Sequence, residues 1–150
     1  MISRKGVEHL RAAIFINNLK ADSEREAISK MLESLKEHAQ VQDLQKLSTA
    51  VFDRHQTDPS LFPGGVAFPH ARTNAVSSLV MVIATCCQPI LFGEIPVRLI
   101  FLIGIPKGAG ADYLELISFL ARHVRGEGVV DRLVQAEDIS SFLAGFAEGT

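Results

Sequence analysis

The run VRLIFLI at residues 97–103 decides the fold of this chain. It is apolar along nearly its whole length and does not alternate between apolar and polar residues, which is typical of a strand covered on both faces. The run LVMVIAT at residues 79–85 has the same character. Two such strands predict a layered domain in which helices cover both faces of a sheet.

The segments around these two strands alternate between strand and helix patterns. Short strands are expected at residues 12–16 and 66–68, and the Pro and Gly content of residues 57–65 predicts a loop. One helix is expected to begin at a capping box of Ser23 and Glu26, and a second is expected to begin near Asp43 and to fray beyond Arg54. Further helices are expected at residues 113–124, 129–134 and 139–146. The expected fold class is therefore α/β, with residues 1–150 in one domain.

The composition excludes several classes of function. The 150 residues are 47% hydrophobic and 21% charged, which is typical of a globular protein. A net charge of −2 gives no basic surface for nucleic acid or for an anionic membrane. The longest apolar run, residues 97–106, contains Arg98 and is too short to span a bilayer. The first residues lack the apolar segment of a secretory signal, so we expect neither export nor direct membrane insertion.

The two cysteines, Cys86 and Cys87, are neighbours in the sequence. On a strand their side chains would point to opposite faces, and neighbouring cysteines rarely bond each other. No further Cys or His stands at the spacing of a zinc site. The pattern favours thiols in a reducing cytosol, so we expect a cytoplasmic protein with no metal.

The stretch GGVAFPHAR at residues 64–72 marks the candidate site. Because Pro69 cannot donate to a sheet ladder, we expect it at a strand end or edge, with His70 accessible where the strand stops. Histidine titrates near neutral pH, and Arg72 places a cation within reach of the same space. The pattern indicates a nucleophilic or proton-transferring histidine that meets an anion. The alternative is a histidine that merely ends a strand.

Phosphoryl transfer is the chemistry that suits these residue types. A neutral imidazole nitrogen can attack phosphorus, and the transfer mainly requires positioning and neutralisation of charge. Arginine binds phosphate oxygens with two parallel donors. Arg54 stands sixteen residues before His70, at the start of the loop that leads to it. On its own, Arg54 would be interpreted as a cation that offsets the dipole at a helix end.

Other features of the chain leave alternatives open. The glycine-rich residues 104–110 superficially suggest a phosphate-binding loop, but they lack the Gly-Lys-Ser/Thr pattern. The hypothesis of a nucleotide-binding protein is supported by this turn alone. Tyr113, the only tyrosine, begins the helix that follows, where an aromatic residue commonly half covers the core. The remaining histidines are interpreted as solvated: His9, His38, His55 and His123. His55 adjoins Arg54, however, and could face the same cleft as His70.

With these residues the chain resembles the EIIA component of the bacterial sugar phosphotransferase system, in its fructose/mannitol type, which includes the nitrogen-regulatory EIIA class. The resemblance rests most specifically on the family stretch G-V-A-I-P-H-[AG]-[RK], which stands here at residues 65–72 with Phe68 in place of Ile. The family also has an arginine sixteen residues before its histidine, and Arg54 matches it without a gap. The likeness covers nearly the whole chain.

The resemblance implies a fold, an activity and a site. The fold would be a three-layer α/β/α sandwich with a mixed, about five-stranded sheet. In that family the histidine matching His70 accepts a phosphoryl group from the carrier HPr and passes it to an EIIB domain. The arginine matching Arg54 holds the phosphate. The resemblance thus implies catalytic His70 and Arg54 supported by Tyr113 and Arg72, without cofactor or metal. We expect an apolar surface for HPr, built from Phe62, Phe68 and the start of the late helix.

Three departures from the family pattern accompany this resemblance. Residues 59–64 replace a loop that is usually rich in Ser, Thr and Gly, and Tyr113 stands where many members have a second active-site histidine. A phenol can hydrogen-bond a phosphate oxygen but cannot be positively charged. No EIIB or EIIC segment is attached, so we expect the chain to act in trans. These departures also support a rival hypothesis, a regulatory EIIA-like module that binds a protein target and uses phosphorylation as a switch.

Overall fold

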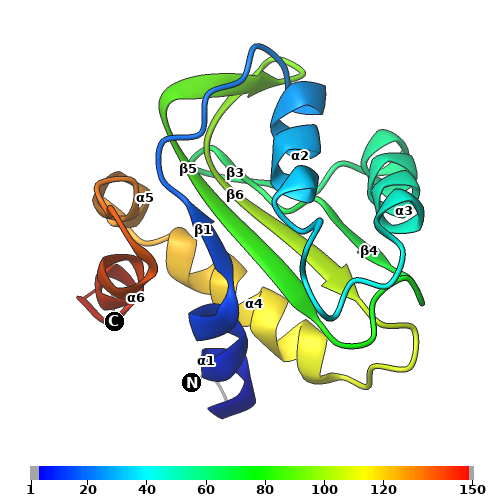
Figure 1. Ribbon diagram of the computed structural model, residues 1–150. Helices are drawn as coiled ribbons and strands as arrows, with labels where there is room; N and C mark the ends of the chain where they lie inside the picture. The colour runs from blue at the N-terminus through cyan, green and yellow to red at the C-terminus, as the bar shows by residue number, and fades with distance from the viewer. Residues whose placement is uncertain (1–3, 149–150) are drawn as a thin grey trace.

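The computed structural model describes residues 4–148 and places a mixed sheet between two layers of helices (Figure 1). The strand order is β1-β5-β6-β3-β2, and β4 pairs with the same strand β6. The strands are β1 (Ile14–Ile16), β2 (Leu61–Phe62), β3 (Val66–Ala67), β4 (His70–Arg72), β5 (Val80–Phe92) and β6 (Ile95–Ile105). The helices are α1 (Arg4–Ala12), α2 (Glu24–Glu33), α3 (Leu44–Thr57), α4 (Asp112–Val124), α5 (Val129–Leu133) and α6 (Ile139–Glu148).

The long antiparallel hairpin of β5 and β6 is the centre of the sheet, with Ile83 paired to Phe101. β1 runs parallel to β5, whereas β3 and β4 both run parallel to β6. β2 pairs antiparallel with β3. The predicted α/β class and mixed sheet with helices on both faces are confirmed. The sheet has six strands because the segment before and after Pro69 forms two short strands along one edge of β6.

Two hydrophobic cores explain why the run at residues 97–103 is continuous. Along β6, Ile100 and Leu102 pack toward α2 and α3, while Leu99, Phe101 and Ile103 pack toward α1, α4, α5 and α6. Side chains alternate across a strand, so a strand covered on both faces needs apolar residues at every position. Figure 1 shows the two groups of helices on opposite sides of the β5–β6 hairpin.

Side-chain caps set the beginnings of α2 and α3. The Ser23 hydroxyl accepts a hydrogen bond from the Glu26 amide at 3.0 Å, and the Glu26 carboxylate accepts one from the Asp22 amide at 3.3 Å. This confirms the predicted capping box, with the carboxylate one residue further back than usual. The Asp43 carboxylate caps α3 by accepting from the Lys46 amide at 3.0 Å.

The predicted end of α3 is wrong, because the helix does not fray beyond Arg54. It continues to Thr57, whose hydroxyl donates to the Asp53 carbonyl at 2.9 Å. The Asp58 amide closes the last turn by donating to the Arg54 carbonyl at 2.8 Å. The longer helix holds Arg54 inside a regular turn and limits the positions its side chain can reach.

The segments before β1 and β3 also differ from expectation. No element was expected at residues 4–11 and a strand was expected from residue 12, yet residues 4–12 form α1 and the first strand begins at Ile14. The expected loop 57–65 contains β2, which turns into β3 through Gly64 and Gly65 at φ values of 91° and 80°. A Cβ on Gly65 would lie 2.7 Å from the Pro96 carbonyl oxygen, so only glycine fits this close approach.

The strand β5 passes through both cysteines and shows the expected alternation. Cys86 is buried and Cys87 is exposed. Burial raises the pKa of the Cys86 thiol to about 12, so this thiol is un-ionised at neutral pH. Among residues 4–148, no helix has the length and apolar character needed to cross a membrane.

Candidate functional site

His70 is the first residue of β4, and its backbone is paired with β6. The sequence interpretation that backbone order stops at Pro69 is wrong in this respect, because β4 continues the parallel pairing with His70 opposite Ile103. Pro69 has no N–H and lies between β3 and β4, where its carbonyl accepts from the Ile103 amide at 3.0 Å. His70 is therefore half-buried and held by the sheet at its edge.

Two hydrogen bonds define the state of the His70 ring. Nδ1 lies 2.7 Å from the Phe68 carbonyl oxygen, which can only accept, so Nδ1 bears the proton. Nε2 then presents a lone pair, and it accepts from Nε–H of Arg54 at 3.1 Å. The Phe68 ring, 1% exposed and stacked on Phe101 at 4.9 Å, fixes the carbonyl in place. The arrangement selects one tautomer and directs its lone pair toward Arg54.

The surroundings of His70 favour the neutral ring. Burial lowers the pKa of His70 below its ordinary 6.5, whereas the Phe68 carbonyl raises it. The Arg54 cation lowers this pKa further, and the Asp58 carboxylate opposes that effect. The net direction is downward, so the ring is neutral and nucleophilic at physiological pH.

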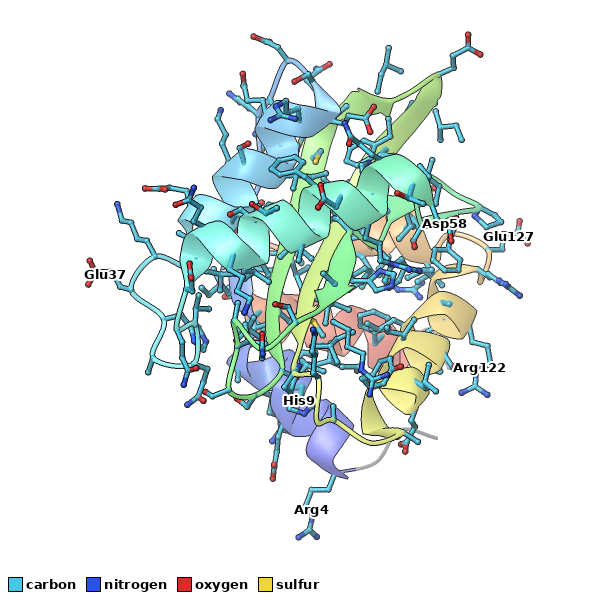
Figure 2. The ribbon with its side chains drawn as sticks, turned by 90° about the vertical axis from the view of Figure 1, so that its right-hand side faces the viewer. Arg4, His9, Glu37, Asp58, Arg122 and Glu127 are labelled. Carbon is cyan, nitrogen blue, oxygen red and sulfur yellow. The ribbon has the colours of Figure 1, made fainter. Side chains whose placement is uncertain are left out.

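Arg54 belongs to the last turn of α3 and reaches His70 with its Nε–H. Its Nη2 atom lies 3.8 Å from a carboxylate oxygen of Asp58. Asp58, labelled in Figure 2, follows the last residue of the same helix. The Arg54 side chain is 46% exposed, so its guanidinium retains donors for an incoming anion. The structure thus places Arg54 and His70 together at one edge of the sheet.

Arg72 and Tyr113 form a second group, which contacts the loop after β6. Nη2 of Arg72 donates to the carbonyls of Lys107 and Ala109, both at 3.1 Å, and Nη1 lies 3.5 Å from the Tyr113 hydroxyl. The Arg72 guanidinium also lies 5.4 Å from the Tyr113 ring centroid. Within the described part of the chain, no hydrogen bond joins either side chain to His70. Arg72 is therefore engaged in holding a loop.

His55 is a residue that the sequence interpretation placed wrongly among solvated histidines. It is 8% exposed, and its Nε2 lies 2.8 Å from a Glu24 carboxylate oxygen. The other Glu24 oxygen accepts from the Gly93 amide at 3.0 Å. His55 thus points away from Arg54 and joins α3 to α2 and to the β5–β6 turn. Its spacing from Leu47 and Val51, at i+8 and i+4, places it on the buried face of α3 and could have revealed this.

The expected apolar surface near the site is only partly present. Phe68 cannot contribute, because it is buried beneath the Phe62 and Phe101 rings. Phe62 is half-buried, whereas Leu114, next to Tyr113 at the start of α4, is 53% exposed. Leu114 is therefore the most exposed of these three apolar side chains.

A neutral histidine whose Nε2 lies beside an arginine, at the edge of a sandwich of this topology, can act as a nucleophile toward an anionic group. The family model "Phosphoenolpyruvate-dependent sugar phosphotransferase system, EIIA 2" matches residues 9–148. The chain belongs to this family.

Curated relatives include proteins of both transport and regulation. The chain is 30% identical over 114 residues to a "PTS system fructose-specific EIIA component" of Haloferax volcanii, a match that covers 74% of each chain. It is 28% identical over 132 residues to a "Nitrogen regulatory protein" of Bradyrhizobium diazoefficiens, covering 76% of this chain and 86% of that one. The chain is therefore an EIIA-type phosphoryl carrier, a phosphotransferase that acts through a phosphohistidine intermediate.

Solved structures share the fold. Nitrogen regulatory protein IIA-Ntr from Neisseria meningitidis superposes with a TM-score of 0.81 at 21% identity, covering 96% of this chain and 99% of that one. The IIA mannitol enzyme of Escherichia coli, solved in complex with phosphorylated IIB, superposes with a TM-score of 0.75 at 21% identity. That superposition covers 89% of this chain and 94% of the other.

Proposed function

We propose that Nε2 of His70 is the phosphoryl acceptor, receiving the group from an HPr-type carrier and passing it to an EIIB domain. The observation that supports this assignment is the bond from Nδ1–H to the Phe68 carbonyl, which leaves Nε2 as the nitrogen with a lone pair. Arg54 lies at this same nitrogen, 3.1 Å away, where an arriving phosphoryl group would need a cation.

The transfer conserves atoms and charge along a simple path. The Nε2 lone pair forms a new N–P bond while the N–P bond of the donor phosphohistidine breaks, and its electron pair returns to the donor ring. The His70 ring gains positive charge as the bond forms. The Nδ1–H bond to the Phe68 carbonyl becomes stronger as the ring becomes cationic, which stabilises the phosphorylated state.

Arg54 and Asp58 would control the charge around the transferred group. When phosphorus arrives at Nε2, Arg54 exchanges its bond to the ring nitrogen for bonds to the phosphoryl oxygens. Asp58 lies 3.8 Å from the Arg54 guanidinium and orients it from the solvent side. Because Asp58 is itself negative, it also favours departure of the phosphoryl group to the next acceptor.

Tyr113 and Arg72 would act at the margin of this site. Arg72 is a positioning residue, because its guanidinium holds the loop that leads into α4. The Tyr113 hydroxyl accepts from Arg72 and retains a proton that it can donate to a phosphoryl oxygen or a partner group. This is the neutral counterpart of the second histidine that the family resemblance would place here.

The proposed partners imply where the protein acts and which surface they would contact. We infer that residues 1–150 act as one EIIA-type domain in the cytoplasm, where it meets HPr and EIIB. Leu114 supports a partner surface, because it is a large apolar side chain exposed beside Tyr113.

A regulatory role is the second candidate, favoured by the 28% identity to a nitrogen regulatory protein. In this case phosphorylation of His70 would change the affinity for a target protein, since it adds roughly two negative charges at neutral pH. Both roles use the same phosphohistidine and differ in which protein meets it.

Intact mass measurement tests the proposed acceptor. The protein is incubated with phosphoenolpyruvate, Enzyme I and HPr, and we expect an acid-labile gain of one phosphoryl group. His70→Ala should abolish this gain, whereas His38→Ala, a substitution of a half-buried histidine at another site, should retain it. A gain that persists in His70→Ala would assign the phosphoryl group to another residue. Loss of the group on addition of an EIIB domain would separate transport from regulation.

A further inference from the structure

A cavity of about 500 Å³ opens between the loop that follows β4, the loop that follows β6, and α1. Neither His70 nor Arg54 lines it. The volume is in the range of sites for small molecules. Its lining includes apolar side chains from Val76, Leu79 and Pro106 and polar ones from His9, Asn74, Ser78, Lys107 and Tyr113.

The polar groups of this cavity suit an anion. Lys107 forms no ion pair within the described part of the chain, and the side chains of Asn74 and Ser78 make no hydrogen bond there. The Tyr113 hydroxyl accepts from Arg72, so its proton remains available to a ligand oxygen. His9, labelled in Figure 2, adds an imidazole from α1. No acidic side chain belongs to the described residues that line the cavity.

We propose that this cavity binds a small organic anion bearing a phosphate or carboxylate group, and that the anion is an effector of phosphoryl transfer at His70. Lys107 would neutralise the charge, while the Asn74 amide and the Ser78 and Tyr113 hydroxyls would bond its oxygens. The effector role rests on the proposed function, whereas the binding site does not.

Arg72 connects the cavity to the phosphoryl-transfer site. It follows His70 by two residues in β4, and its guanidinium holds the Lys107 and Ala109 carbonyls and the Tyr113 hydroxyl. Lys107 and Tyr113 also line the cavity. A ligand that contacts both would shift the groups to which Arg72 is bonded, and this change would reach His70 through the short strand.

Calorimetry on the unphosphorylated protein tests binding without any partner. The probes are glycerol 3-phosphate, glycerate and the neutral control glycerol, which together separate phosphate from carboxylate recognition. We expect saturable binding of at least one anion and none of glycerol. Failure of both anions to bind at up to about 10 mM, or equal binding of glycerol, would overturn the proposal.

Three variants locate the bound anion. Lys107→Gln should weaken binding roughly tenfold, because a charge-assisted bond is lost. Lys20→Gln removes the same charge from the loop between β1 and α2, at the other end of the molecule in Figure 1, and should bind as the wild type does. Arg54→Gln should also bind normally. Lost binding in Arg54→Gln, or unchanged binding in Lys107→Gln, would place the anion elsewhere and refute the site.

The effector role is tested by the initial rate of phosphorylation from HPr with and without the anion that binds. Saturating anion should change the wild-type rate by at least about twofold, and Lys107→Gln should need roughly tenfold more anion for the same change. An unchanged wild-type rate would refute the effector role. Binding by calorimetry without any phosphorylation of His70 would instead refute the proposed function and leave the cavity as an anion site.

Discussion

At the scale of single residues, the charges next to His70 determine how readily its ring is protonated. Arg54 lowers the pKa of His70 and Asp58 raises it. Arg54→Gln should therefore raise this pKa, and Asp58→Asn should lower it. NMR titration of the His70 ring protons measures both shifts, with His38 as the internal reference. Shifts of the same sign in the two variants would contradict the arrangement at Nε2.

The pH dependence of phosphoryl acceptance follows from the same lowered pKa. Because burial lowers the pKa of His70 below 6.5, the neutral ring predominates at pH 7 and the initial rate should be level above that point. The rate should fall as the pH drops through the lowered pKa. The free energy of unfolding should also fall as the pH drops below 6.5, because the unfolded state, with its higher histidine pKa, then binds more protons than the folded state. Stopped-flow measurement of the rate at constant ionic strength checks the predicted pH profile, and a rate that rises on acidification would contradict it.

Sequence reasoning placed His70 and Arg54 correctly in relation to each other but not Arg72. The spacing of sixteen residues brings the first two side chains within 3.1 Å. Arg72, only two residues from His70, was expected in the same space, yet its guanidinium binds the carbonyls of Lys107 and Ala109. Those carbonyls come from a loop more than thirty residues away in the sequence, and nothing local in β4 specifies their position.

At the scale of elements, α3 joins the site to the rest of the fold through His55. Its ring bonds Glu24 at 2.8 Å and meets the edge of Phe92 at 5.6 Å. His55→Ala should lower the free energy of unfolding by about 2–4 kcal/mol, since it removes a buried hydrogen bond and leaves a cavity. Urea unfolding measures this, and His38→Ala, at a half-buried position, should cost less than about 1 kcal/mol. Equal losses in the two variants would show that the His55–Glu24 contact is not structural.

The beginning of α4 presents the apolar side chain closest in sequence to Tyr113. Leu114→Glu should slow phosphorylation by HPr roughly tenfold, because a charge would replace the apolar contact of a partner. The matched control is Leu91→Glu, which should leave the rate unchanged. Leu91 lies near the end of β5 and is 59% exposed. Stopped-flow kinetics at several HPr concentrations check this. A slow Leu91→Glu together with a normal Leu114→Glu would place the docking surface on the β5–β6 hairpin.

Elements marked by a helix cap or by a long continuous apolar run were predicted well, and those defined by pairing were not. The capping box at Ser23 and the long runs in β5 and β6 specify their own structure. β2 and β4 have two and three residues, and they exist because β3 and β6 supply their hydrogen bonds. Such strands have too few residues for a period-two pattern, so their presence depends on tertiary structure.

At the scale of the whole molecule, the two cores are separated by the sheet and differ in their relation to the site. Phe101, in the core with α4 and α6, stacks on Phe68 at 4.9 Å and meets Phe142 at 6.1 Å. Ile100, its neighbour in β6, packs on the opposite face in the core with α2 and α3. Both side chains are fully buried, but only Phe101 supports the residue whose carbonyl bonds Nδ1 of His70.

This division predicts that a destabilising substitution in one core will change the pKa of His70, whereas one in the other core will not. Phe101→Ala should cost about 3–5 kcal/mol and Ile100→Ala about 2–5 kcal/mol of unfolding free energy. Only Phe101→Ala should loosen the Phe68 carbonyl, weaken its bond to Nδ1–H and thereby lower the pKa of His70 further. Urea unfolding and NMR titration of the two variants, under conditions where both remain folded, compare these effects. An equal change at His70 in both would mean that the site depends on global stability and not on the aromatic packing beneath it.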